Sequence, residues 1–191
     1  MTQQIRELEN GSLEFTASED FYFEAGGSIN PLVLVYDTYG TLNNQKDNAI
    51  LVHHALSTSS HLTATDKNPQ NGWWQEMVGP GKPLDSNRYF IICINNLGSC
   101  YGSSGPVSIN PKTAKAYAAD FPAVAIADMV RSQKMLIDAL GIKKLHAVLG
   151  SSMGAMLSTT WLTLYPDHAR YLISISSCLK GYPANHANRM I

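Results

Sequence analysis

The feature of this sequence that most constrains its fold is a serine between two glycines, with Gly150, Ser152 and Gly154 joining two apolar segments. The apolar run 145–149 is short enough for a buried strand, and the residues after the motif can form a helix until Pro166 stops it. A strand, a tight turn and a helix are the context of a nucleophile elbow. Such a turn leaves no room for side chains at the two glycine positions.

Ser152 is therefore the candidate nucleophile. An elbow exposes the serine oxygen at the carboxyl edge of a sheet, and a helix starting near Met153 offers unpaired N–H groups and the positive end of its dipole. Because these favour developing negative charge, Met153 N–H is a candidate oxyanion donor. Ser151 is a rival only by position, since shifting the motif by one residue would put Ser152 and Ala155 where the turn requires glycine.

Composition narrows the class of partner. The chain has 191 residues, 45% of them hydrophobic, which suits one domain with a sizeable core. A net charge of -1 without a Lys/Arg cluster argues against nucleic acid and favours a small-molecule substrate. Cys93, Cys100 and Cys178 have neither the spacing of a zinc site nor that of a disulfide framework, so we expect reduced thiols and no metal.

No targeting or membrane segment is expected. Residues 1–10 are polar and lack the apolar core of a signal peptide. No apolar stretch is long enough to cross a bilayer. These observations predict a cytoplasmic protein that does not bind membranes.

The order of strands and helices predicts an α/β sheet that is mostly parallel. Between Ser12 and Tyr39 the alternation of apolar and polar residues predicts antiparallel edge strands. Continuous apolar runs predict buried strands at 49–53, 89–94, 145–149 and 171–175.

Two helices are predicted in addition to the one after the elbow. Residues 73–78 can form a short helix before the Gly-Pro-Gly run at 79–81. A longer helix is expected after a cap at Asp120 and a first-turn proline at Pro122, ending at Gly141. Its apolar stripe consists of Ile126, Val130, Ile137 and Leu140. Residues 95–121 show little periodicity, and loops of this length are usually functional.

Several of these segments together resemble the homoserine O-acetyltransferase family of the α/β-hydrolase superfamily. The long run 95–111 is the most specific of them, and the resemblance extends from about Ser12 to Ser177. It also includes 36–43, 54–56, 72–74, 120–122, 128–133 and the elbow. The elbow departs from the family's common Gly-Gly-Ser-Met-Gly-Gly, because this chain has Gly-Ser-Ser-Met-Gly-Ala at 150–155.

The resemblance implies an α/β-hydrolase fold, with a mostly parallel sheet and antiparallel N-terminal strands. It also implies transfer of an acetyl group from acetyl-CoA to the hydroxyl of L-homoserine, a step of methionine biosynthesis, by a ping-pong route through an acyl-serine at Ser152. In this fold the second oxyanion donor comes from the loop after the third strand, which here makes Leu56 N–H the partner of Met153 N–H. Acetyl-CoA is then a substrate, no cofactor is implied, and family members are commonly homodimers.

The partners of a catalytic serine are expected to follow it in the order acid, then histidine. After Ser152 the candidates are Asp167, His168 and His186. Asp167 and His168 follow Pro166 at the far end of the elbow helix, about 20 Å from Ser152 at 1.5 Å per residue. His186 lies in a polar tail with no acidic residue after it. His53 and His54 suit packing of the oxyanion loop better than base catalysis.

We therefore expect residues 1–191 to form one partial domain that lacks the family's lid and the C-terminal part of its core. Such a fragment would be incomplete at its C-terminus, with about six of eight strands, an unpaired sheet edge, poor stability and little activity alone.

Several alternatives remain open at this point. Some family relatives transfer succinyl groups, and others act on serine instead of homoserine. A plain hydrolase could also share the fold. The polypeptide could also be a non-catalytic remnant or binding fragment. Cys100, on the glycine-rich loop, could be read as a nucleophile, although no residue is evidently placed to activate it, and shaping the pocket wall suits it better.

Overall fold

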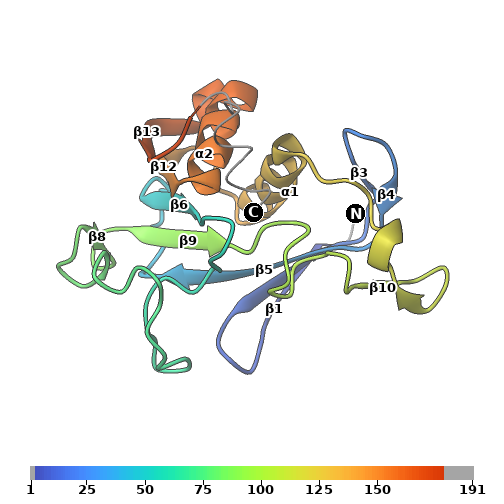
Figure 1. Ribbon diagram of the computed structural model, residues 1–191. Coiled ribbons are helices and arrows are strands. Elements are labelled where there is room, and N and C mark those ends of the chain that lie inside the picture. The colour runs from blue at the N-terminus through green and yellow to red at the C-terminus, as the bar shows by residue number, and fades with distance from the viewer. Residues whose placement is uncertain (1–2, 179–191) are drawn as a thin grey trace.

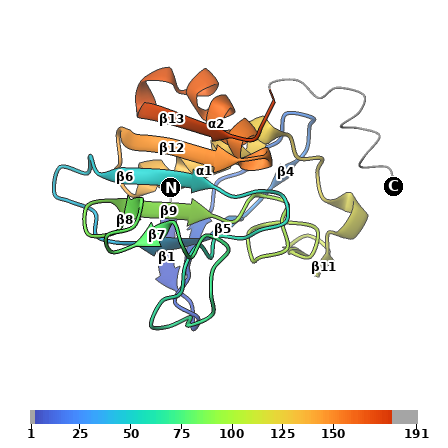
Figure 2. The ribbon, with the colours of Figure 1, turned by 60° about the vertical axis from the view of Figure 1, so that its left-hand side comes forward.

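A seven-stranded sheet organises the computed structural model, which describes residues 3–178 (Figure 1, Figure 2). Its strands lie in the order β1-β2-β5-β9-β6-β12-β13. In that order their bounds are Gln3–Glu7, Leu13–Ala17, Leu32–Tyr39, Phe90–Ile94, Ala49–His53, Leu145–Ser151 and Ala169–Ile175.

Strand direction divides the sheet into two parts. The pairs β6/β9, β6/β12 and β12/β13 are parallel, whereas β1/β2, β2/β5 and β5/β9 are antiparallel. Helix α1 (Ile126–Ala139) lies on the connection from β9 to β12, and α2 (Met153–Leu164) joins β12 to β13. This confirms the predicted α/β sheet with antiparallel N-terminal strands.

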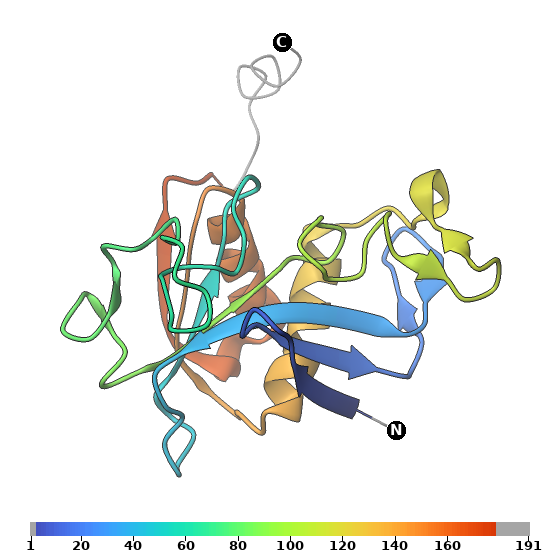
Figure 3. The same cartoon turned by 90° about the horizontal axis from the view of Figure 1, so that it is seen from below.

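The two faces of the central strands enter different cores. Both helices cover the same face of the sheet, above β9 and β5 in Figure 1 and behind β5 in Figure 3. Leu51 and Val148 pack there with Leu136 and Trp161, while Val52 and Leu149 face the opposite core. That second core is closed by the segment around Leu62, Trp73, Val78 and Leu84. Burial on both faces explains why β6 and β12 read as continuous apolar runs.

Short elements decorate the long connections. Three two-stranded pairs are formed by β3 (Phe21–Tyr22) with β4 (Ser28–Ile29), β7 (Val78–Gly79) with β8 (Leu84–Asp85), and β10 (Ile109–Asn110) with β11 (Lys115–Ala116). Two 3-10 helices, η1 (Ala118–Asp120) and η2 (Pro166–His168), complete the described elements.

The helix predicted over 73–78 is wrong. These residues form turns that lead into β7, with Met77 N–H and Val78 N–H both donating to Trp74 O. Their conformation is set from outside, because Trp74 N–H donates to Leu62 O and a Cβ on Gly72 would lie 2.1 Å from the Leu62 carbonyl carbon. Contacts with the backbone of the loop at Leu62 thus override a short local preference.

The predicted start of the first long helix is also wrong. Asp120 ends η1, and α1 begins six residues later at Ile126. Its cap is built by Asp128, whose Oδ2 accepts from Ala125 N–H at 2.8 Å and whose Oδ1 accepts from Glu24 N–H at 2.9 Å. The predicted stripe is correct in that Val130 and Ile137 are buried, and Gly141, with φ of 72°, follows the end of the helix.

Seven strands are found where about six were expected, because the polar segment β1 pairs with β2. The five residues of β1 are all exposed, so its sequence lacks the alternation of apolar and polar residues that would predict a strand. At the other edge, β13 pairs with β12, and Tyr171 and Ile173 are 59% and 48% exposed. Within the described chain this is the unpaired sheet edge that the sequence predicted.

Besides the short β10/β11 pair within it, the long loop after β9 is held along β5 by serine side chains and backbone bonds. Ser103 Oγ accepts from Val35 N–H at 3.0 Å, and Ser104 Oγ accepts from Val33 N–H at 2.9 Å. The Asn95 amide joins Ser60 to Tyr101 O. These bonds pin the loop along β5 and return residues 96–101 to the carboxyl edge of the sheet.

Replacing Asp128 with alanine is predicted to destabilise the protein by about 3 kcal/mol, because two backbone N–H groups and Arg131 lose a fully buried acceptor. Urea unfolding measures the change. Asp138→Ala on the same helix is the control: the Asp138 side chain, which pairs with Lys134, is 55% exposed, and the pair should contribute less than about 1 kcal/mol. Equal losses in both variants would contradict the capping role.

Candidate functional site

Ser152 occupies a strained backbone position between β12 and α2. Its φ of 53° and ψ of -120° lie outside the regions that side chains with a Cβ favour. Such a conformation costs of order 1–3 kcal/mol and persists only where its surroundings enforce it. Here Ser152 N–H donates to Ile175 O at 3.0 Å, and the side chain is exposed. The elbow geometry thus occurs at the serine for which the motif predicts it.

The two motif glycines meet backbone on both sides of that turn. A Cβ on Gly150 would lie 2.3 Å from Gly154 O, and a Cβ on Gly154 would lie 2.0 Å from His53 O. Neither contact can relax by moving a flexible side chain. Ser151, the positional rival, is the last residue of β12 and is half-buried beside Ile175.

The loop that carries Leu56 reaches the same edge of the sheet. It follows β6, which pairs in parallel with β12, so the loop and the elbow both leave the carboxyl ends of adjacent strands. Leu56 and Met153 line one cavity of about 330 Å³ together with part of the long loop. The other lining residues are His54, Thr58, 96–101, Val124 and Met129. The predicted oxyanion residues are therefore brought together at one cavity, while their catalytic role stays a prediction.

Both histidines at the end of β6 are buried and held by hydrogen bonds. His53 Nδ1 lies 2.7 Å from Ser158 Oγ, and burial lowers the pKa of His53 to about 3. His54 Nδ1 lies 2.7 Å from Ala55 O, and burial also lowers the pKa of His54. Because a carbonyl only accepts, His54 carries its proton on Nδ1, and Nε2 accepts from Asn96 N–H. Both rings are thus neutral structural groups at pH 7.

The structure does not bring an acid and a histidine to Ser152 from the segment just after α2. Asp167 and His168 lie in η2, at the far end of the helix, with the His168 ring against Tyr165. His186 lies outside the described residues. Among residues 3–178, no cluster of three or more His, Cys, Asp or Glu side chains could hold a metal ion.

The cysteines differ in environment. Cys93 is buried, and its pKa is raised well above the ordinary thiol value by burial. Cys100 is exposed and lines the cavity beside Leu56, so it shapes the pocket wall as expected.

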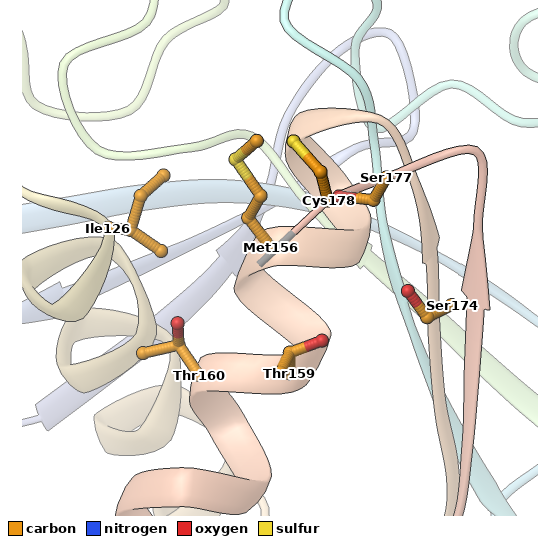
Figure 4. Close-up of a pocket in the computed structure, with 7 residues that line it drawn as sticks. All are labelled: Ile126, Met156, Thr159, Thr160, Ser174, Ser177 and Cys178. Carbon is orange, nitrogen blue, oxygen red and sulfur yellow. The ribbon is translucent and has the colours of Figure 1, made fainter. Parts of the chain in front are cut away.

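A second cavity, of about 320 Å³, lies between α2, the end of β13 and the start of α1 (Figure 4). Met156 extends from α2 toward Ile126 of α1, and Ser174 of β13 lies across from Thr159. Thr160, Ser177 and Cys178 complete its lining, so none of its lining residues carries a charge. It is separate from the cavity that Leu56 and Met153 share.

Sequence reasoning missed a set of buried polar side chains beneath the elbow. Gln133, Asn96 and Ser158 are each at most 2% exposed. One signal was available, since Gln133 falls on the apolar stripe of α1 between Val130 and Ile137. A polar residue at such a position calls for a buried partner.

Comparison with known proteins decides the family. The model of the alpha/beta hydrolase fold matches residues 48–191. The chain belongs to this family. A homoserine O-acetyltransferase of Geotalea daltonii is 52% identical over 154 residues, which are 80% of this chain and 42% of that protein. A serine O-succinyltransferase of Emericella nidulans is 46% identical over 175 residues, which are 92% of this chain and 34% of that protein.

The fold comparison agrees. The crystal structure of homoserine O-acetyltransferase from Bacillus anthracis superposes with a TM-score of 0.87 at 36% identity, covering 98% of this chain and 50% of that chain. The resemblance stated from the sequence is thereby confirmed. This member of the alpha/beta hydrolase fold family spans half or less of the length of these relatives. Neither helix of its described part combines the length and apolar character that a membrane span needs.

Exchanging Ser152 for glycine is predicted to leave the protein about 1 kcal/mol more stable than exchanging it for alanine, because glycine removes the strain of a positive φ. Chemical denaturation of the two variants measures the difference. The same two exchanges at Ser151 are the matched control. Because Ser151 lies in strand β12, its glycine variant should be less stable than its alanine variant by about 1 kcal/mol. A glycine variant less stable than the alanine variant at Ser152, as at Ser151, would show that Ser152 is unstrained.

Proposed function

We propose that the protein containing this chain is an O-acyltransferase that moves an acetyl group from acetyl-CoA to the hydroxyl of L-homoserine. The observation that carries this is the strained elbow at Ser152, whose neighbour Met153 shares one cavity with Leu56. The homoserine O-acetyltransferase name of the Geotalea daltonii relative supports the choice of substrates.

In the proposed reaction Ser152 Oγ attacks the thioester carbonyl, and Leu56 N–H and Met153 N–H stabilise the oxyanion. The carbon–sulfur bond breaks, CoA leaves as a thiol, and Ser152 carries the acetyl group. The hydroxyl of homoserine then attacks this ester through a second tetrahedral intermediate, which releases O-acetylhomoserine and restores Ser152. Two separate half-reactions make the route ping-pong.

The proton transfers need a general base, since a serine hydroxyl is a weak nucleophile. His53 and His54 are engaged with Ser158 and Ala55, and His168 lies at the far end of α2. The proposal therefore assigns the base to a part of the protein beyond residues 3–178. Acetyl-CoA is a substrate in this scheme, and the scheme uses no cofactor.

The name of the Emericella nidulans relative favours one alternative within the same chemistry, transfer of a succinyl group to L-serine. The cavity wall formed by Leu56, Tyr101 and Met129 is largely apolar. We infer an acetyl donor first because of the higher identity to the Geotalea daltonii protein. A cytoplasmic location and a homodimer accompany the proposal as expectations.

CoA release from acetyl-CoA, measured on the protein as its gene encodes it, should depend on added L-homoserine. Ser152→Ala should lower the rate at least about 10³-fold, because the nucleophile is lost. Ser151→Ala, one residue away in the strand, is the matched control and should retain most activity.

Each other outcome has a distinct meaning. Release without homoserine would identify a hydrolase, and release only with succinyl-CoA or L-serine would identify the alternative transferase. Release that is unchanged in Ser152→Ala, or no release with any of these donors and acceptors, would contradict the proposed function.

A further inference from the structure

Five polar side chains lie buried in one connected group directly beneath the elbow. They are at most 2% exposed and come from the end of β6, the loop after β9, α1 and α2. The members are His53, His54, Asn96, Gln133 and Ser158. Apolar side chains at these positions would avoid the cost of burying polar groups, so a group of this size calls for a role beyond filling the core.

One arm of the group runs from α1 to the loop that carries Leu56. Gln133 Nε2 donates to Asn96 Oδ1 at 3.0 Å, and Asn96 N–H donates to His54 Nε2 at 3.3 Å. His54 Nδ1–H then donates to Ala55 O at 2.7 Å. The chain of bonds therefore ends on the carbonyl of the peptide whose N–H belongs to Leu56.

That last bond fixes a direction as well as a position. In a trans peptide the C=O and N–H vectors point in opposite directions within one rigid plane. Holding Ala55 O on the buried side thus turns Leu56 N–H away from it, toward the cavity that Leu56 lines. Thr58 N–H and Thr58 Oγ1 also donate to Ala55 O, each at 3.2 Å, which closes the turn.

The other arm reaches the elbow helix. Ser158 Oγ lies 2.7 Å from His53 Nδ1 and 3.0 Å from Gly154 O, within the first turns of α2. The Gln133 side chain is close enough to the His53 ring to interact with it, yet His53 Nε2 and Gln133 Oε1 both lack a partner among the bonds of the described residues. Because Ser158 has one hydroxyl proton and donates it to Gly154 O, His53 Nδ1–H donates to Ser158 Oγ, and His53 Nε2 carries no proton.

We propose that Gln133, Asn96 and the two histidines are positioning residues, which lock the Ala55–Leu56 peptide plane to the start of α2 and so hold the two oxyanion donors at a fixed separation. In this arrangement His53 and His54 are both Nδ1–H tautomers, donating to Ser158 Oγ and Ala55 O. The proposal rests on the proposed function for the role of the two N–H groups, but the geometry it assigns exists without any substrate.

The test is Gln133→Met, which keeps the length of the side chain and removes both polar atoms. The reaction is measured on the protein as its gene encodes it. In this variant kcat for acyl transfer should fall between about tenfold and a hundredfold, with KM changed less than about twofold, because Leu56 N–H is no longer held in the direction of the oxyanion. Exchange of the Leu56 amide with solvent deuterium should accelerate at least about tenfold. Ser132→Ala is the matched control, since Ser132 is buried on the same helix but bonds only within it, to Met129 O.

Imidazole nitrogen NMR gives a readout that needs no activity. It should show His53 and His54 both protonated on Nδ1 in the native protein, with the His54 ring nitrogens shifted in Gln133→Met but not in Ser132→Ala. If native His54 carries its proton on Nε2, or if both variants change Leu56 exchange equally, the positioning role is overturned. A native protein that shows these NMR and exchange results but no acyl transfer would overturn the proposed function and leave the positioning geometry standing.

His53 supplies the conservative pair. His53→Gln keeps a donor that can reach Ser158 Oγ, and its Leu56 exchange rate should stay within about threefold of native. His53→Leu removes that donor and should behave like Gln133→Met. Equal behaviour of the two His53 variants would show that packing, rather than the hydrogen bond, holds the loop.

Discussion

The close contact of Gly154 with the end of β6 is the constraint on which the site depends. With His53 O only 2.0 Å from where a Cβ would stand, the first turn of α2 rests directly on the backbone of the neighbouring strand. This contact sets how far the positive end of α2 lies from the loop that follows His53. The strain at Ser152 follows from it, because the chain must turn from β12 into a helix already pressed against β6.

Two kinds of force maintain this arrangement. Apolar burial fixes the scaffold, since Leu51 and Val148 face one core and Val52 and Leu149 the other. At roughly 25 cal/mol per Å² it stabilises the sheet without specifying the direction of any single peptide. Hydrogen bonds such as that from His54 to Ala55 O are directional, so they can fix the orientation of the Ala55–Leu56 peptide plane.

The fold could be predicted wherever local pattern and tertiary contacts agree. The apolar runs of β6 and β12 and the glycines of the elbow are such places, because each pattern has one physical cause. The segment around Trp74 and the start of α1 could not be predicted, since Leu62 and Glu24, distant in sequence, determine them. Strand β1 was not predicted because its residues are all exposed and show no alternation of apolar and polar side chains.

The candidate site was predictable only in part, for the same reason. Ser152 and Met153 follow from one motif, and Leu56 from its place after a buried strand. The buried partners of that loop are separated by about 40 residues or more, as Asn96 is from His54, so no spacing in the sequence joins them. Among these residues only Gln133 is signalled by the sequence pattern, because it is a polar residue on the apolar stripe of α1. Burying the polar side chain of Gln133 lowers the stability of the packed helix. This loss is explained if the Gln133 amide helps to hold the Ala55–Leu56 peptide plane, which no apolar side chain at that position can do.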